Sequence, residues 1–373
     1  MMLNGNGEEH GLGRAIIRAL HLDLLLLGGV VLLLAMGFVV LYSASGENLD
    51  TLYRQGVRVG IAFTVLMVMA QIPANHLRQW SPWVYAGGVL LLLAVMFFGE
   101  VGKGAQRWLD LGVVRFQPSE FMKIAVPMMV AWYFADRPLP PRFLEVVAAA
   151  LLVMVPAVLI AKQPDLGTAL LVAGSGLVII FLAGVRWRIL MGLGALALVA
   201  TPLLWHFMQD YQRRRVLTLL NPESDPLGAG YHIIQSKIAI GSGGFYGKGW
   251  LNGTQSQLEF LPERSTDFIF AVYAEEFGLM GILLLLSLYL LVILRGLTIA
   301  LRAQDTYSRL LAGSLSFTFF VYVFVNTGMV SGLLPVVGVP LPLFSYGGTS
   351  MVTLMAAFGI LMSINSHRRL LAR

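Results

Sequence analysis

The sequence contains no cysteine, and this absence removes several kinds of chemistry. Without thiols the chain can form neither a disulfide framework nor a thiolate or cysteine-ligated zinc site. Its six histidines are scattered and include no HExxH-type pair, the usual signature of a zinc hydrolase. The sequence therefore gives no support to redox or zinc chemistry.

Charged residues are also scarce. They make up 12% of the 373 residues, whereas hydrophobic residues make up 57% and the mean hydropathy is +0.76. These values lie outside the range of soluble globular domains and predict a polytopic membrane protein, with no nucleic acid as a partner. Glu8 and Glu9 precede the first apolar run and no small-residue cleavage site follows, so we expect the first span to be retained.

Ten apolar runs are long enough, at about 20 residues, to cross roughly 30 Å of hydrocarbon. They lie near residues 22–43, 56–73, 80–99, 118–135, 143–161, 165–184, 187–208, 268–294, 309–331 and 347–366. The predicted fold class is an all-α polytopic membrane protein with ten transmembrane helices in one domain, residues 1–373. Thirteen basic residues on the N-terminal side, against seven in the short loops opposite, predict that both termini are cytoplasmic.

One connection is much longer than the others. Residues 209–267 form a predicted large extracytoplasmic loop between helices 7 and 8. Loops of this length are usually functional or disordered, and the aromatic residues and amphipathic "YHIIQSKIAI" stretch argue against disorder. Because fourteen of the twenty acids and all five lysines fall on the outer face, we expect the chemistry there.

The segment "LPERSTDFIFAVYAEEFG", residues 261–278, carries charges into an apolar helix. Its charged residues are Glu263, Arg264, Asp267, Glu275 and Glu276. Helix capping is one interpretation of Asp267, because acids complement the positive end of a helix. The alternative is a functional carboxylate, since Ala271, Ala274 and Gly278 share its helical face and resemble the wall of a cavity. The two deeper glutamates need partners or water.

Three further outer segments precede predicted helix starts, and the first two carry charges. In "GKGAQRWLDLGVVRFQPSEFMKIA", residues 102–125, cations surround Trp108, either as interfacial anchors or as part of a polar interior that includes Glu120 and Lys123. In "KQPDLGTA", residues 162–169, Lys162 and Asp165 suit an ion pair and a helix cap at a tight turn.

The third segment, "GLLPVVGVPLPLFSYGGTS" at residues 332–350, is interrupted by proline and glycine. It predicts an outer re-entrant or extended loop before the last span. There Ser345, Thr349 or Ser350 is expected to cap a helix, and the backbone amides offer an anion site. The isolated "RRR" at 213–215 is typical of a solvated or headgroup-facing patch.

The motifs "GAQRWLDLG", "RFQPSEFMKIA", "QPDLGTAL", "GSGGFYGKGW", "LPERSTDFIFAVYAEEFG" and "PLPLFSYGGTS", in this order, closely resemble the SEDS family (shape, elongation, division and sporulation). The match spans nearly the whole chain. The wording "RSTDF" is similar to the RodA branch, whereas the FtsW branch usually reads "AHTDF".

This resemblance implies a peptidoglycan glycosyltransferase that polymerises lipid II during cell elongation, on the outer face of the bacterial cytoplasmic (inner) membrane. It implies a class B penicillin-binding transpeptidase and the elongation machinery as partners. It also implies Asp267 as the essential acid and roles for Trp108 and Glu259.

Our mechanistic hypothesis makes Asp267 the general base on the acceptor GlcNAc 4-hydroxyl, with undecaprenyl pyrophosphate as the leaving group. Partial desolvation would tune its basicity upward. Substrate-binding roles are expected for Arg107, Trp108, Arg115, Glu120, Lys123, Lys237, Lys248, Glu259, Glu263, Ser345 and Thr349. Of these, the cationic side chains are candidates to clamp pyrophosphate, with or without a divalent cation such as Mg²⁺ or Mn²⁺. The alternatives are a lipid II flippase and a non-catalytic scaffold.

Overall fold

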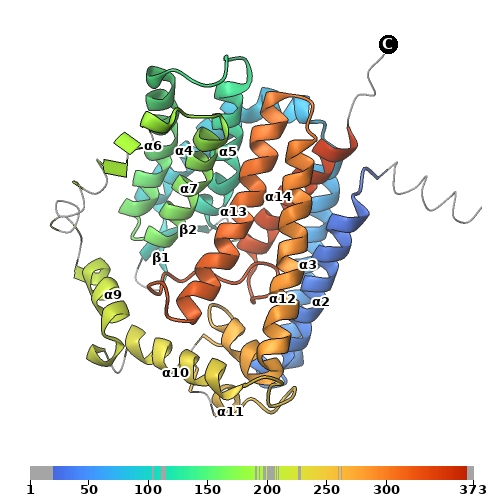
Figure 1. Cartoon of the computed structure of the whole chain (residues 1–373), viewed down its shortest axis with the longest axis vertical. Coiled ribbons are helices and arrows are strands. Elements are labelled where there is room, and N and C mark those ends of the chain that lie inside the picture. The colour runs from blue at the N-terminus through green and yellow to red at the C-terminus, as the bar shows by residue number, and fades with distance from the viewer. Residues whose placement is uncertain are drawn as a thin grey trace, which may run out of the picture.

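The computed structural model describes residues 20–102, 105–110, 115–189, 191–192, 194–195, 199, 206, 208, 210–225, 228–258, 260–261 and 263–367. Most helices in this part of the chain run side by side along the long axis, and a group of shorter helices crosses one end (Figure 1). We call this end the α10 end. The start of α2 and the end of α14 lie at the opposite end (Figure 1).

The long helices correspond closely to the predicted spans. They are α2 (Leu24–Ala44), α3 (Leu49–Gln71), α4 (Ala74–Phe98), α5 (Pro118–Ala135), α6 (Phe143–Lys162), α7 (Leu166–Leu182), α12 (Ile269–Leu301), α13 (Thr306–Val330) and α14 (Thr349–Ser366). Seven helices in the described part of the chain are long and apolar enough to cross a membrane, and α7 is a shorter apolar helix. The predicted span 187–208 falls largely outside the described residues, so the count of ten stays a prediction.

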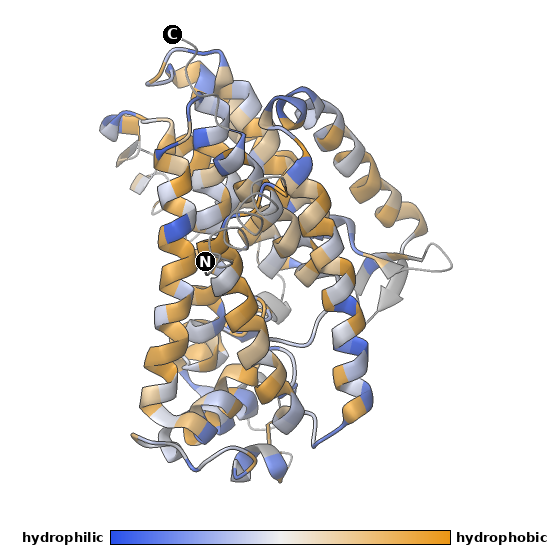
Figure 2. Cartoon of the chain, turned by 90° about the vertical axis from the view of Figure 1, so that its right-hand side faces the viewer, coloured by the Kyte–Doolittle hydropathy of each residue, from blue (hydrophilic) through white to orange (hydrophobic). Residues whose placement is uncertain are grey.

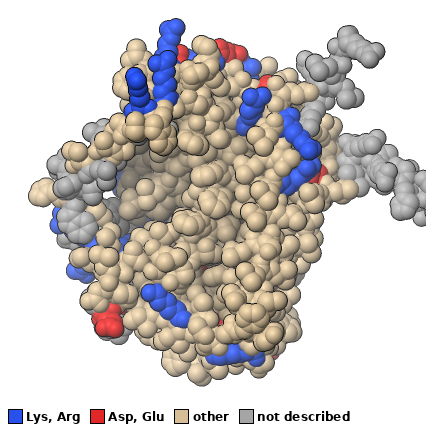
Figure 3. All heavy atoms as spheres, in the orientation of Figure 1, with Lys and Arg blue, Asp and Glu red and all other residues tan. Residues whose placement is uncertain are grey.

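The distribution of polarity agrees with a bundle embedded in hydrocarbon. Apolar residues occupy most of the length of the long helices, and hydrophilic residues gather toward the ends and connections (Figure 2). On the face drawn in Figure 3, charged side chains lie at the two ends and leave a broad uncharged band between them. This pattern is expected when lipid tails surround the middle of a bundle.

Helices that lie far apart in the sequence pack against one another in the core. Contacts join α3 with α14, α2 with α12, α5 with α7, and α13 with α7 and α5. The tightest packing uses glycine: a Cβ at Gly359 of α14 would collide with the backbone of Leu66 in α3. The last helix is thereby held against the third, and this contact positions the α14 start described below.

A small antiparallel sheet, absent from the sequence prediction, lies between α4 and α5. Its strands are β1 (Glu100–Gly102), β2 (Ala105–Asp110) and β3 (Arg115–Phe116), in the order β1-β2-β3. Leu109 pairs with Phe116 across β2 and β3. Because successive side chains of a strand point to opposite faces, β2 directs Arg107 and Trp108 to different sides.

The long connection after residue 209 contains several short helices among the residues that the structure describes. It contains α9 (Asp210–Leu220), the 3₁₀ turn η1 (Pro222–Ser224), α10 (Ala229–Ser242) and α11 (Thr254–Gln257). The amphipathic "YHIIQSKIAI" stretch lies in α10, which buries Ile233, Ser236 and Ala239 and packs against α12 and α13. These shorter helices cover the α10 end of the bundle (Figure 1).

Helix α12 is broken at Gly278, whose φ of 63° and ψ of −162° are not helical. The glycine-rich segment 243–249 packs into this break. The amides of Lys248 and Gly249 donate to the carbonyls of Glu275 and Glu276, both at 3.0 Å, while Leu279 N donates to Gly244 O at 3.0 Å. The backbone groups released by the break are therefore satisfied by the inserted segment, as burial in a membrane protein requires.

Candidate active site

Asp267 lies at the α10 end, in the turn directly before α12. The amides of Thr266 and Phe268 donate to Glu263 O, at 3.0 and 3.3 Å, and close this turn. The N-cap position of α12 is occupied by Phe268, whose side chain makes no cap hydrogen bond. Asp267 therefore stands one residue before the cap position, still close to the positive end of α12, so its interpretation as an acid that complements the helix start stays open.

The loop between α13 and α14, residues 331–348, packs against the Asp267 turn. Ser345 Oγ donates to Thr266 O at 2.6 Å, and Tyr346 N donates to Ser265 O at 2.9 Å. Helix α14 begins after Gly348, which supplies no side-chain cap. The prediction that Ser345, Thr349 or Ser350 caps α14 is therefore wrong, because Ser345 instead links two loops.

Asn326 of α13 connects the same two segments from inside the bundle. Its side chain is fully buried, and Nδ2 donates to Asp267 O at 2.9 Å and to Val339 O at 2.7 Å. From the other side, a Cβ at Gly338 would lie 3.5 Å from Asp267 Oδ2. The carboxylate of half-buried Asp267 thus lies close to Gly338 in the α13–α14 loop.

A cavity of about 610 Å³ lies between α3, the sheet, α5 and the start of α14. It is lined by Arg58, Ile61, Trp108, Phe116, Glu120, Tyr346, Gly347, Gly348, Thr349, Val352 and Thr353. The predicted site residues Trp108, Glu120 and Thr349 therefore meet at one cavity. Tyr346 joins this cavity to the Asp267 turn, because its backbone amide bonds to Ser265.

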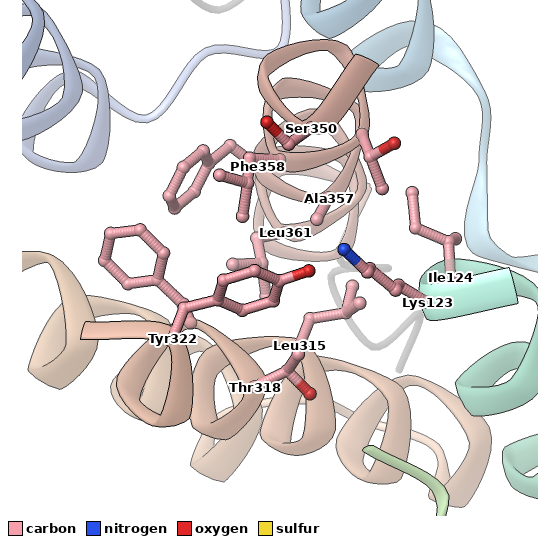
Figure 4. Close-up of a pocket in the computed structure, with 12 residues that line it drawn as sticks. Lys123, Ile124, Leu315, Thr318, Tyr322, Ser350, Ala357, Phe358 and Leu361 are labelled. Carbon is pink, nitrogen blue, oxygen red and sulfur yellow. The ribbon is translucent and has the colours of Figure 1, made fainter. Parts of the chain in front are cut away.

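Glu120 and Lys123 form an ion pair beside this cavity, as their one-turn spacing predicted. Lys123 Nζ is 2.5 Å from Glu120 Oε1, and both side chains are buried. Lys123 also lies 4.8 Å from the centre of the Tyr322 ring. Figure 4 shows the amine reaching from α5 into the space between α13 and α14, toward the Tyr322 hydroxyl. The second oxygen, Glu120 Oε2, is buried and has no hydrogen-bond partner among the residues that the structure describes.

Arg107 and Trp108 point to different sides of β2. The guanidinium of Arg107 donates to Gln163 O at 3.2 Å and to Pro164 O, and it lies 3.9 Å from Asp165. Asp165 in turn caps α7 by accepting from Thr168 N at 3.2 Å, which confirms the predicted cap. Its cationic partner in the described part of the chain is Arg107 and not Lys162, which the sequence predicted. Arg107 therefore anchors β2 to the α6–α7 turn, while its neighbour Trp108 lines the cavity.

The remaining predicted residues lie apart from the cavity or outside the described residues. Lys248 Nζ is 2.6 Å from Glu275, and exposed Glu263 accepts from Thr266 Oγ1 at 2.8 Å. A Cβ at Gly332 would collide with Lys237, so this lysine lies beside the start of the α13–α14 loop. At Arg115 only the backbone is described, and Glu259 lies outside the described residues.

The two deep glutamates have the partners that the sequence required. Fully buried Glu275 accepts from Lys248, from Thr254 Oγ1 at 3.0 Å and from Gln255 N at 3.1 Å. Glu276 accepts from Ser43 Oγ. The expectation that Ala271, Ala274 and Gly278 line a cavity is wrong, because all three are buried and Gly278 packs against the glycine-rich segment.

His232 of α10 lies next to the Asp267 turn. Its ring stacks on Phe268 with 5.4 Å between centroids. Burial lowers the pKa of His232 below its ordinary value of 6.5, against the opposing influence of Glu263 and Asp225. The ring is thus favoured in its neutral form, in contact with the residue that begins α12.

Sequence reasoning missed three residues that the structure brings to the site: Arg58, Asn326 and Tyr346. A signal existed for Arg58, because a cation inside a predicted span needs a polar surrounding. Asn326 and Tyr346 gave no such signal. Within the described residues, no three His, Cys, Asp or Glu side chains lie close enough together to hold a metal ion.

Comparison with known proteins finds relatives over nearly the whole chain. The family model FtsW/RodA/SpoVE, described as cell cycle protein, matches residues 22–370. Peptidoglycan glycosyltransferase MrdB of Escherichia coli (strain K12) is 57% identical over 354 residues, which is 95% of this chain and 96% of that protein. The protein of the same name from Helicobacter pylori (strain ATCC 700392 / 26695) is 38% identical and covers 94% of this chain and 91% of its own.

Solved structures show the same fold. One is a chain of a peptidoglycan synthase complex that coordinates polymerization and crosslinking. It matches with a TM-score of 0.82 and 36% identity, over 93% of this chain and 98% of that chain. The rod shape determining protein RodA of Thermus thermophilus matches with a TM-score of 0.71 and 31% identity, over 93% and 97% of the two chains.

Proposed function

This chain belongs to the FtsW/RodA/SpoVE family, as its motifs predicted, and from this premise we propose that it is a peptidoglycan glycosyltransferase that polymerises lipid II. The two MrdB relatives bear the name of that activity and align over nearly their full length. We place the reaction on the outer face of the bacterial cytoplasmic membrane. This requires ten spans with both termini inside, so that the α10 end faces outward.

The observation that carries the proposal is the setting of Asp267. The residue is half-buried and its main-chain carbonyl accepts a hydrogen bond from Asn326. Its neighbour Ser265 is bonded to Tyr346, which lines a cavity of about 610 Å³. A polymerase needs a carboxylate in such a place, because the acceptor must lose a proton while the lipid-linked donor is held nearby.

In the proposed reaction, Asp267 takes the proton of the acceptor GlcNAc 4-hydroxyl. The hydroxyl oxygen forms a bond to the anomeric carbon of the donor sugar, and the bond from that carbon to the pyrophosphate oxygen breaks. The electron pair leaves with undecaprenyl pyrophosphate, and the configuration at the donor carbon is inverted. Trp108 supplies an aromatic face at the cavity, and Glu120 with Lys123 supplies charged groups for the substrate.

Cations near the site differ in how available they are to the leaving group. Lys123 and Lys248 already face Glu120 and Glu275, and Arg107 is engaged with the α6–α7 turn. Lys237, in contrast, lies at an exposed position beside the α13–α14 loop. We assign Arg107 a positioning role for Trp108 and leave substrate contact to the other cations, Arg115 included.

We also propose a class B penicillin-binding transpeptidase and the elongation machinery as partners. The support is the matched chain from a peptidoglycan synthase complex that combines polymerization and crosslinking. A transpeptidase beside the outer face would receive glycan strands as the polymerase releases them.

The test is polymerisation of purified lipid II in detergent, where a flippase has no two compartments to connect and a scaffold makes no product. We expect glycan strands from the wild-type chain and none from Asp267→Asn or Asp267→Ala, with unchanged folding. Asp50→Asn, which alters an exposed acid at the start of α3, is the matched control and should polymerise normally. Retained turnover by Asp267→Ala would refute the assignment.

A further inference from the structure

The glycine-rich segment that fills the break in α12 carries aromatic side chains on its exposed side. Phe245 is 53% exposed, Tyr246 is 82% exposed, and their rings meet edge to face with 5.0 Å between centroids. Trp250, directly after the segment, is 45% exposed. These three large rings are left at the surface, although rings of this size usually contribute to a core or an interface.

The same stretch carries almost no charge. Residues 241–253, "GSGGFYGKGWLNG", contain no acid, and Lys248 is their one charged residue. Its Nζ is 2.6 Å from Glu275, whose side chain is fully buried, so this charge is directed into the bundle. The exposed side of the stretch therefore presents aromatic rings and glycine backbone.

The contacts of Trp250 show at which depth of the bundle this surface lies. Its indole Nε1 donates to Val39 O of α2 at 3.1 Å, and its ring lies 6.0 Å from that of Tyr42. Helix α2 has 21 residues, which is about 30 Å and matches the hydrocarbon thickness of a bilayer. Val39 is about 8 Å before the end of this helix at Ala44, at 1.5 Å per residue. Because exposed Glu47 follows soon after that end, the Trp250 ring lies where hydrocarbon meets the headgroups.

The lipid-facing side of α12 continues directly into this surface. Leu279 N donates to Gly244 O at 3.0 Å, and Met280 N donates to Phe245 O at 3.2 Å. Leu279 and Met280 are 43% and 51% exposed, and Leu283, one turn further along, is 52% exposed. Because α12 is long and apolar enough to cross a membrane, these side chains face lipid. The aromatic surface is thus continuous with an apolar surface that the bilayer covers.

We propose that Phe245, Tyr246 and Trp250 form an aromatic anchor that inserts into the outer leaflet of the membrane, between the phospholipid headgroups and the first carbons of the acyl chains. Tyrosine and tryptophan favour this layer because they combine an apolar ring with a hydrogen-bonding group. A partner domain outside the membrane would have to reach below the headgroups to cover the same rings, so the observations favour lipid. This lipid contact is independent of the proposed reaction.

Because the chain has no cysteine, the depth of single residues can be measured with a label at one position at a time. Phe245→Cys and Tyr246→Cys are prepared in the full-length protein, labelled with a nitroxide and placed in nanodiscs of phosphatidylethanolamine and phosphatidylglycerol. Collisions of the label with oxygen, which concentrates in hydrocarbon, are compared with its collisions with a neutral nickel complex, which stays in water. At both positions we expect oxygen to relax the label more strongly than the nickel complex does.

Two positions of the same chain calibrate the result. Leu290→Cys, at an exposed position in the apolar part of α12, is the lipid reference. Glu223→Cys, at an exposed acid in η1, is the water reference and should show the reverse order of the two reagents. It also controls for the apolar character of the nitroxide, because a label that drew any exposed loop into lipid would do so there as well.

A second measurement keeps an aromatic ring in place, which guards against a cysteine variant that fails to fold. Tyr246 is replaced by photoreactive p-benzoylphenylalanine, the protein is irradiated in the same nanodiscs, and the intact mass shows what the ring contacts. We expect addition of phospholipid at Tyr246, as at Leu290, and none at Glu223.

The outcomes separate lipid from water and from protein as the environment of the rings. Stronger relaxation by the nickel complex at either position shows rings in water and overturns the proposal. Protection from both reagents, together with a photo-crosslink between two copies of the chain, shows a protein contact and also overturns it. Lipid II polymerisation is measured separately, so failure of the anchor leaves the proposed function standing, and the reverse.

Discussion

Loss of one member of the Glu120–Lys123 ion pair should destabilise the protein, and loss of both should restore its stability without restoring activity. The two side chains are 8% and 6% exposed, so solvent does little to stabilise either charge. In Lys123→Met the buried Glu120 carboxylate loses its partner, which costs about 3–5 kcal/mol of unfolding free energy. Neutral residues of similar size at both positions are often tolerated or even stabilising by about 1–4 kcal/mol. The double variant Glu120→Gln with Lys123→Met should therefore unfold close to the wild type.

The assay pairs denaturant unfolding in detergent micelles with the rate of lipid II polymerisation. If the pair contacts substrate, the double variant is stable but inactive. The control is the exposed Arg78–Asp136 pair, whose side chains are 35% and 81% exposed; the matching change should alter stability by less than about 1 kcal/mol. A double variant as unstable as the single one would refute the electrostatic argument, and a double variant with wild-type activity would refute the substrate contact.

Two further predictions concern the surroundings of Asp267. Asn326→Leu removes the donor shared by Asp267 O and Val339 O. Each carbonyl left without a hydrogen bond costs about 1–3 kcal/mol of unfolding free energy, and the loosened Asp267 turn should lower kcat more than it changes KM. Ser331→Ala, at the end of the same helix, is the control, and an unaltered kcat in Asn326→Leu would contradict the positioning role. Because the pKa of His232 lies below its unfolded value of 6.5, the unfolded state binds the proton first, so stability should fall as pH drops from about 6.5 toward the lowered folded value. His232→Phe should remove this pH dependence and His76→Phe should keep it; an unchanged profile in the former would contradict the assignment.

The sequence predicted the spans well because membrane thickness imposes a length on apolar runs. The run at 118–135 coincides with α5, where Pro118 stands at the first helical turn. The start of α3 was predicted seven residues late, at 56 instead of Leu49. Its first turns, "LDTLYRQ", are polar, and the cap is made by Asn48 accepting from Thr51 N at 3.2 Å. Hydropathy marks the part of a helix that lies in hydrocarbon, not the part that extends beyond it.

The site was predicted only in part, because its key contacts join distant segments. Ser345 meets Thr266 across 79 positions, and Arg107 meets Pro164 across 57. Such pairs have no periodicity in the sequence. The break in α12 was hidden for the same reason. Gly278 was counted as a small residue on a helical face, but it adopts a positive φ, which glycine tolerates, and segment 243–249 satisfies the backbone groups that the break releases.

The acids of residues 261–278 acquire different roles through this break. Glu275 and Glu276 lie deep in the bundle. Glu275 accepts hydrogen bonds from Lys248, in the inserted glycine-rich segment, and from Gln255 N, while Glu276 accepts one from Ser43. Both side chains are almost fully buried, so an acceptor sugar does not reach them. Asp267 precedes the helix, is half-buried, and is positioned through its backbone by Asn326. We therefore assign proton transfer in the proposed reaction to Asp267 and not to the two buried glutamates.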